Sequence, residues 1–197
     1  MRTLLVALLG TSVGTGAWAQ DTSEEEGAPE AEGDEGMIEM TKDSGGVLVG
    51  VDLAFGKVTG TPGNHIGVGI GGDVWSGYEI AVGTVGLIPR LKIGYENFLE
   101  KDKNGGSLIT VYPGFLVAVH VGNVAPWAGI GLGLGSLDQD KLQVKRENKF
   151  GFEFGFGVNY QISDATAVGG FFAYDAIFTP GQSVKVVFLG AGTQFKF

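Results

Sequence analysis

Residues 149–162 read KFGFEFGFGVNYQI, and every second residue of this stretch is apolar or aromatic. The even positions hold four phenylalanines, a valine, a tyrosine and an isoleucine, whereas the odd positions hold lysine, glycine, glutamate, asparagine and glutamine. Successive side chains of a β-strand point to opposite faces, so all of the apolar side chains would share one face. A helix would mix the two sets around its circumference. The stretch therefore predicts a β-strand with one apolar face.

The same alternation occurs in further runs, which turn residues separate from one another. These runs are residues 47–57, 66–80, 85–98, 107–121, 126–135, 166–177 and 184–197. With residues 149–162 they make eight predicted strands of about 10–15 residues. A tilted strand needs roughly 9–11 residues to cross the apolar band of a membrane, whereas strands of soluble proteins are usually about 5–6 residues long. The lengths favour a transmembrane sheet.

The connections between these runs alternate in predicted length. Short ones lie near residues 81–84, 122–123 and 163–164, and longer polar ones are residues 58–65, 99–106, 136–148 and 178–183. Asn104-Gly105 is the expected turn of the second long connection. Outer-membrane barrels combine short periplasmic turns with longer outward loops. The pattern therefore predicts an all-β, eight-stranded antiparallel transmembrane β-barrel, with both chain ends on the periplasmic side.

Composition and charge exclude several other classes of protein. The chain has no cysteine, so neither disulfides nor a thiolate zinc cluster can form. The net charge of −9 is concentrated in residues 21–36, which hold eight acidic residues and no basic one. Residues 37–197 have a net charge of only −2, and no basic face is available for nucleic acid.

The first residues have the features of a secretory signal peptide. Arg2 precedes the apolar run LLVALL, and Ala17 and Ala19 are small residues at the positions that a signal peptidase reads, so cleavage is expected before Gln20. Residues 20–45 are acidic with few large apolar residues, which predicts a disordered periplasmic linker, either a plain tether or a partner-binding tail. The expected organisation is a signal peptide at 1–19, a linker at 20–45 and a barrel at 46–197.

The polar faces of the predicted strands carry most of the charge. A barrel of eight strands has an interior just wide enough for side chains to fill, and buried charges must be paired. We therefore expect an interior ion-pair network centred on Arg90 and Lys92, either as a plug or as an ion path. Its members are Asp52, Asp73, Glu79, Arg90, Lys92, Glu96, Glu153 and Asp175. The apolar faces carry only Lys57 and Lys185, at strand ends where a lysine can reach water.

Two segments, PWAGIGLGLG at 126–135 and GAGTQFKF at 190–197, resemble small outer-membrane β-barrels of the OmpA, OmpX and opacity-protein type. The resemblance covers residues 46–197. It implies integration in the outer membrane of a Gram-negative bacterium, among its lipids. It also implies that Gly192, Phe195 and Phe197 form the signal read by the barrel-assembly machinery, although Gly190 stands where the family usually has a polar residue. Such a resemblance implies fold and location, and it says little about activity.

No catalytic constellation emerges from the sequence. The only histidines are His65 and His120, and the residue two positions after His120 is Gly122, whereas lipid A deacylase barrels have His-x-Ser. Residues 100–105 resemble the start of a calcium loop, but Val111 stands where the closing glutamate is needed. Each histidine is expected to be a polar interior or rim residue, and no metal or cofactor is expected.

The predicted function is therefore non-enzymatic, either structural or in surface interaction through extracellular loops. Residues 136–148 (SLDQDKLQVKREN) form the longest and most charged predicted loop, and thus the expected contact for an unknown surface partner. The protein is expected to be a monomer. The alternative function is a narrow, porin-like channel for ions or small solutes.

Overall fold

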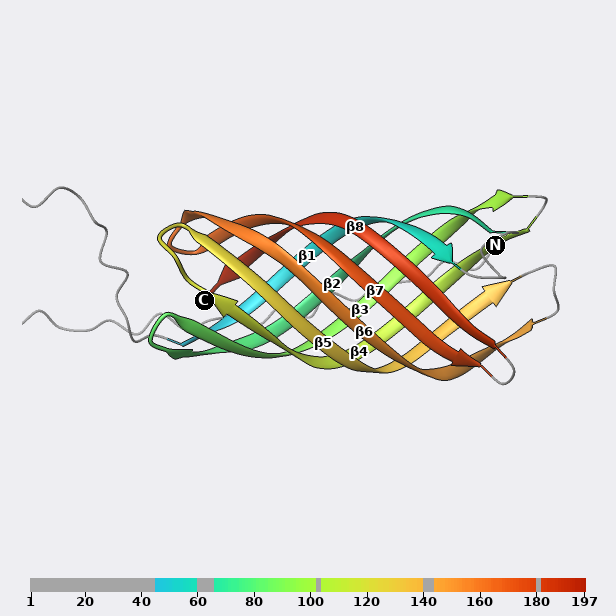
Figure 1. Cartoon of the computed structure of the whole chain (residues 1–197), viewed down its shortest axis with the longest axis horizontal. Coiled ribbons are helices and arrows are strands. Elements are labelled where there is room, and N and C mark those ends of the chain that lie inside the picture. The colour runs from blue at the N-terminus through green and yellow to red at the C-terminus, as the bar shows by residue number, and fades with distance from the viewer. Residues whose placement is uncertain (1–44, 60–65, 102–103, 140–143, 180–181) are drawn as a thin grey trace, which may run out of the picture. The chain divides into compact units, whose positions relative to one another are not determined.

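A computed structural model describes residues 45–59, 66–101, 104–139, 144–179 and 182–197. These residues form one sheet of antiparallel strands that closes on itself through pairing of the first and last strands (Figure 1). The strands are β1 (Gly46–Thr59), β2 (Ile66–Val82), β3 (Val85–Lys101), β4 (Asn104–Val119), β5 (Val124–Gln139), β6 (Val144–Ser163), β7 (Thr166–Thr179) and β8 (Gln182–Lys196). The predicted eight-stranded antiparallel barrel is confirmed.

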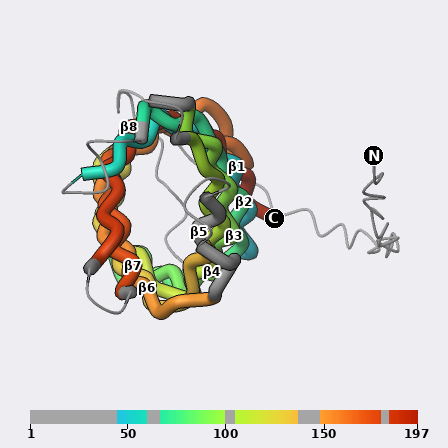
Figure 2. Tube along the Cα trace, turned by 90° about the vertical axis from the view of Figure 1, so that its right-hand side faces the viewer, coloured from blue at the N-terminus to red at the C-terminus, as the bar shows by residue number. Residues whose placement is uncertain are grey.

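Each strand pairs with its neighbours in chain order, and Figure 2 shows the resulting ring of strands. The seam between β1 and β8 has main-chain hydrogen bonds up to the last residue. Val47 N donates to Phe197 O at 3.1 Å, and Phe197 N donates to Val47 O at 2.9 Å. Closure leaves no free sheet edge, as a sheet that crosses a membrane requires. Within the described ranges, no helix is long and apolar enough to span a membrane.

One end of the barrel, called the turn end below, carries three short connections together with Gly45 and Phe197. The connections are residues 83–84, 120–123 and 164–165. Gly83 and Gly122 have φ angles of 63° and 58°. Tight hairpin turns need such left-handed backbone, which glycine adopts without steric cost. The short connections therefore lie where the sequence predicted them.

At the opposite end, called the loop end, the strands run further than predicted. Lys101 pairs with Asn104, Gln139 pairs with Val144, and Thr179 pairs with Gln182. The prediction of long loops at 99–106, 136–148 and 178–183 was therefore wrong, as was the turn at Asn104-Gly105. These segments do not show the alternation of apolar and polar residues, yet their main chains keep the hydrogen bonds between paired strands. Beyond the apolar band both faces of a strand can be polar, so alternation no longer marks its end.

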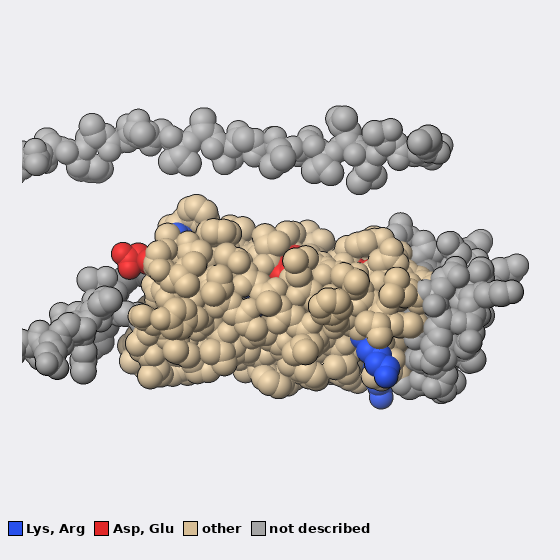
Figure 3. Space-filling model, turned by 90° about the horizontal axis from the view of Figure 1, so that it is seen from above, with Lys and Arg blue, Asp and Glu red and all other residues tan. Residues whose placement is uncertain are grey.

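Burial confirms which face of each strand points outward. Along β1, Val47, Val49, Val51, Leu53 and Phe55 are exposed, and the two last are 70% and 63% exposed. The residues between them point into the barrel. Figure 3 shows an outer wall with little charge on it. This inside-out arrangement is that of a membrane barrel, because a soluble barrel would bury its large apolar side chains.

Candidate functional site: the filled interior

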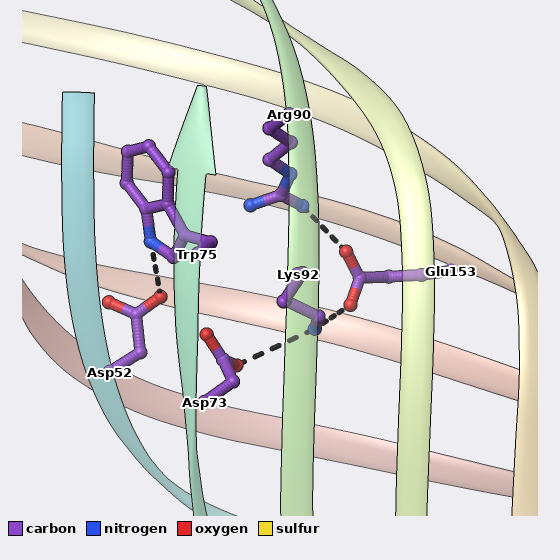
Figure 4. A network of polar contacts seen from close by, with 6 residues as sticks. All are labelled: Asp52, Asp73, Trp75, Arg90, Lys92 and Glu153. Carbon is purple, nitrogen blue, oxygen red and sulfur yellow. Dashed lines mark hydrogen bonds and ion pairs between the residues drawn. The ribbon is translucent and has the colours of Figure 1, made fainter. Parts of the chain in front are cut away.

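The centre of the interior contains an ion-pair network between β3 and β6. Arg90 and Lys92 lie two residues apart on β3 and both point inward, toward Glu153 of β6 (Figure 4). Arg90 Nη2 lies 2.6 Å from Glu153 Oε1, and Lys92 Nζ contacts the other carboxylate oxygen of Glu153. Lys92 Nζ also lies 3.5 Å from Asp73 Oδ2. One carboxylate is thus shared by two cations, in a site that water scarcely reaches.

Aromatic side chains border this network. Trp75 Nε1 donates a hydrogen bond of 3.0 Å to Asp52 Oδ2 (Figure 4). The guanidinium carbon of Arg90 lies 6.0 Å from the Trp75 ring centroid, and Lys92 Nζ lies 5.9 Å from that of Tyr112. Cations at this distance from an aromatic face are attracted by the ring quadrupole. The rings therefore help to hold both cations in an interior of low dielectric constant.

Two further predicted members, Glu96 and Asp175, are 5% and 1% exposed. Asp175 lies directly opposite Glu153 in the register of β6 and β7. Among the described residues, neither carboxylate oxygen of Asp175 has a hydrogen-bond partner, nor has Glu96 Oε2. With Asp52, Asp73 and Glu153, the interior holds five carboxyl groups for Arg90 and Lys92. The centre is therefore richer in acid than in base.

Glu79 does not belong to this network, which corrects the predicted grouping. Glu79 Oε1 lies 2.7 Å from His120 Nε2, and Glu79 Oε2 accepts a hydrogen bond of 2.9 Å from Lys196 Nζ. These three residues lie at the turn end, where Glu79 pairs with Gly46 in the register. His120 was expected to be a polar interior or rim residue, but its contact with Glu79 was not predicted, because β2, β8 and the turn after β4 meet only in the closed barrel.

Two apolar clusters lie inside the barrel, one on each side of the charged centre. The loop-end cluster comprises Ala54, Val58, Phe98, Leu108, Ala173, Ile177, Val184, Val186 and Phe188, with Phe171 packed against it. The turn-end cluster comprises Leu48, Trp75, Ile88, Leu116 and Ala118, with Trp127 packed against it. Sequence reasoning missed both clusters. The available signal was that runs such as 186–189 (VVFL) are apolar at both parities, so that an inward apolar face accompanies the outward one.

One small cavity lies within the described interior. A cavity of about 20 Å³ lies beside Asp52, Trp75 and Arg90, which is room for about one water molecule. Asn159 and Gln194 also line it, and Asn159 Nδ2 donates a hydrogen bond of 3.0 Å to Gln194 Oε1. This one cavity is by itself too small to be a water-filled passage past the charged centre.

The residues that resemble an assembly signal lie on both faces of the chain at β8 and the residue that follows it. Phe195 and Phe197 are 40% and 80% exposed on the outer wall. Gly192 faces inward, and a Cβ atom at this position would overlap the Asp52 carboxylate. The closeness of Asp52 therefore gives a structural reason for glycine at position 192, separate from the predicted assembly signal. Ala17, Ala19 and His65, together with residues 140–143 of the predicted contact loop, lie outside the described residues.

Comparison with known proteins identifies the class of fold. No protein-family model matches the chain, and no curated protein matches it. Among solved structures, Neisserial surface protein A is 18% identical with a TM-score of 0.61, over 79% of this chain and 100% of that chain. Ail, the attachment invasion locus protein of Yersinia pestis, is 15% identical with a TM-score of 0.56, over 77% of this chain and 99% of that chain.

At these identities the likeness shows the fold. The chain has the fold of the small eight-stranded outer-membrane β-barrels, as the sequence resemblance implied.

Proposed function

We propose that the protein is an integral outer-membrane barrel with a closed lumen, which acts without enzymatic chemistry through the surface it exposes at the loop end. The observation that carries this proposal is the order of layers inside the barrel. A charged centre held by Glu153 lies between two apolar clusters. An ion would have to lose its hydration shell to pass either cluster, which is very costly. The closed interior therefore favours a structural or surface-interaction role over the alternative role as a channel.

The orientation in the membrane is part of this proposal. The short turns and both ends of the described barrel share one end. In outer-membrane barrels, short turns face the periplasm. A periplasmic turn end agrees with the predicted signal peptide and acidic linker, which would place residue 46 on that side. The loop end would then face outward, and the segment 136–148 at that end remains the proposed contact for a partner.

The surroundings of His120 support a structural role for this histidine. Its ring contacts Glu79, which Lys196 also contacts, and its main-chain N donates to Thr84 O at 2.8 Å. A general base must be within reach of a nucleophile that it can activate. Here the histidine and the lysine contact both oxygens of one carboxylate, an arrangement that joins β2 to β8 and to the turn after β4.

Conductance tests the closed lumen directly. The full chain is refolded into lipid vesicles, and its gel mobility is compared with and without heating. A heat-dependent shift in gel mobility indicates a folded, inserted barrel. Unchanged mobility would contradict the proposal that the protein is a membrane barrel. The folded protein is then recorded in a planar bilayer at several salt concentrations.

We expect no unitary steps from the folded protein. Steady, salt-dependent steps would favour the channel, and the selectivity of Arg90→Gln and Lys92→Gln variants would then report on the conducting path.

A further inference from the structure

Two lysines lie on the outer wall near the loop end. Among the strand residues whose side chains the structure describes, Lys57 and Lys185 are the only charged ones that are exposed. Figure 3 shows basic side chains projecting from the wall near one end of the barrel. Two cations at the edge of an apolar wall call for an explanation, because charge is costly wherever a wall faces lipid tails.

The register brings the two lysines together although they are far apart in the chain. Lys57 lies opposite Val187 and Thr59 lies opposite Lys185, on the seam between β1 and β8. Lys57 and Lys185 are therefore diagonal neighbours on one face, about 7–8 Å apart at their bases. Lysine has a flexible four-carbon stem with three donors on its ammonium group. Both ammonium groups can therefore reach one anion between them.

The part of the chain that the structure describes places no negative charge against these lysines. Among the described residues, no ion pair involves Lys57 or Lys185. The connections next to them, residues 60–65 (GTPGNH) and 180–181 (PG), contain no acidic residue. The ion pairs of Arg90 and Lys92 lie inside the barrel, where the described carboxyl groups outnumber these two cations. The pair on the wall is left for an external anion.

The wall below the lysines is strongly apolar. Phe55 and Leu189 lie opposite each other in the register, two residues along their strands from the pair Lys57 and Val187. Their side chains are 63% and 67% exposed. Leu53, one repeat further, is 70% exposed. A cationic pair at the edge of such a strip matches a molecule with an anionic head and an apolar tail.

We propose that the Lys57–Lys185 pair binds the phosphate headgroup of an anionic membrane lipid, whose acyl chain lies along Phe55 and Leu189. The proposal rests on the proposed insertion in a membrane, with the lysines at the level of the headgroups. Attraction between a basic side chain and an anionic lipid surface and burial of acyl chains act together at this position. The wall thus recruits a specific class of lipid to one seam of the barrel.

The test compares lipids that differ only in headgroup charge. The full chain is refolded in detergent, and binding of the first lipid is followed by native mass spectrometry during titration with phosphatidylglycerol or phosphatidylcholine of identical acyl chains. We expect wild-type protein to bind phosphatidylglycerol about tenfold or more tightly than phosphatidylcholine. The K57Q/K185Q variant should lose this preference, and the K57R/K185R variant should keep it, because arginine retains the charge.

Two outcomes would overturn the proposal: equal binding of both lipids by the wild-type protein, or an undiminished preference in K57Q/K185Q. Displacement of phosphatidylglycerol by an excess of inorganic phosphate would also overturn it, because the site would then select a free anion. Each variant is first checked for the heat-dependent mobility shift. Loss of this shift in the wild-type protein would contradict membrane insertion itself, whereas a folded barrel without lipid preference would contradict only the lipid site.

Discussion

Arg90 and Glu153 are 63 residues apart in the chain, yet Arg90 Nη2 lies 2.6 Å from Glu153 Oε1 inside the barrel. Their strands, β3 and β6, are not neighbours in the sheet, so the contact crosses the interior. The same carboxylate contacts Lys92. Glu153 thus links β6 to β3 across the interior through two cations. These contacts add to the main-chain hydrogen bonds between neighbouring strands.

Glu153→Gln is expected to destabilise the barrel strongly, because it leaves two buried cations without their shared carboxylate. Loss of one partner of a buried ion pair typically costs about 3–5 kcal/mol. The free energy of unfolding is measured by urea titration in lipid vesicles. Asp164→Asn, in an exposed turn, is the control and should change this free energy by less than about 0.5 kcal/mol. A midpoint for Glu153→Gln equal to that of the control would contradict the network.

Glu79→Gln is expected to have a smaller effect than Glu153→Gln. The side chains of its partners His120 and Lys196 are 31% and 34% exposed, so water can replace part of what they lose. An ion pair near solvent contributes about 1 kcal/mol or less. The same urea titration ranks the two variants, and an equal or larger loss for Glu79→Gln would show that the turn-end cluster is the stronger one.

Gly192→Ala is expected to destabilise the barrel by about 1–3 kcal/mol, because the added methyl group meets the Asp52 carboxylate that accepts the Trp75 hydrogen bond. Gly170→Ala is a matched control on the adjacent strand. There an added Cβ would meet only Gly190 O, at 3.7 Å, so little change is expected.

Removal of the obstructing carboxylate separates the two explanations for Gly192. In an Asp52→Ala background, Gly192→Ala should cost less than in the wild type. If its effect on refolding and on assembly in cells is the same in both backgrounds, the glycine is needed as an assembly signal and not as space for Asp52.

Replacement of residues 140–143 by Asn-Gly is expected to leave the barrel folded. Gln139 and Val144 are paired, so a two-residue turn can join them, and Asn-Gly favours the turn type that hairpins need. Deletion of the whole predicted loop 136–148 should instead impair folding, because it removes paired strand ends and the buried Ser136. The heat-dependent gel shift of each variant distinguishes the two results. A folded barrel after the larger deletion would contradict the observed strand lengths.

The alternation of residues 149–162 and of seven other runs was sufficient to predict the number of strands, their antiparallel order and the outward apolar face. Side-chain direction in a strand depends only on local backbone geometry. Residues at alternate positions of a strand therefore point alternately into the barrel and out of it. The turns at Gly83 and Gly122 were predictable for the same reason, since their conformation is local. Most of the charged residues that point into the barrel could be predicted too, because the polar face of each strand follows from that strand's own sequence.

The sequence by itself determined the strands and their two faces, but only the tertiary structure decided which side chains meet. Contacts such as Arg90 with Glu153, Glu79 with Lys196 and Lys57 beside Lys185 depend on closure and on the stagger between strands, which no single strand encodes. Closure also creates the confined interior in which residues such as Leu116 and Phe188 pack on both sides of the charged centre. The packing of these interior side chains is therefore a property of the closed barrel, since burial arises only when distant strands surround the same space.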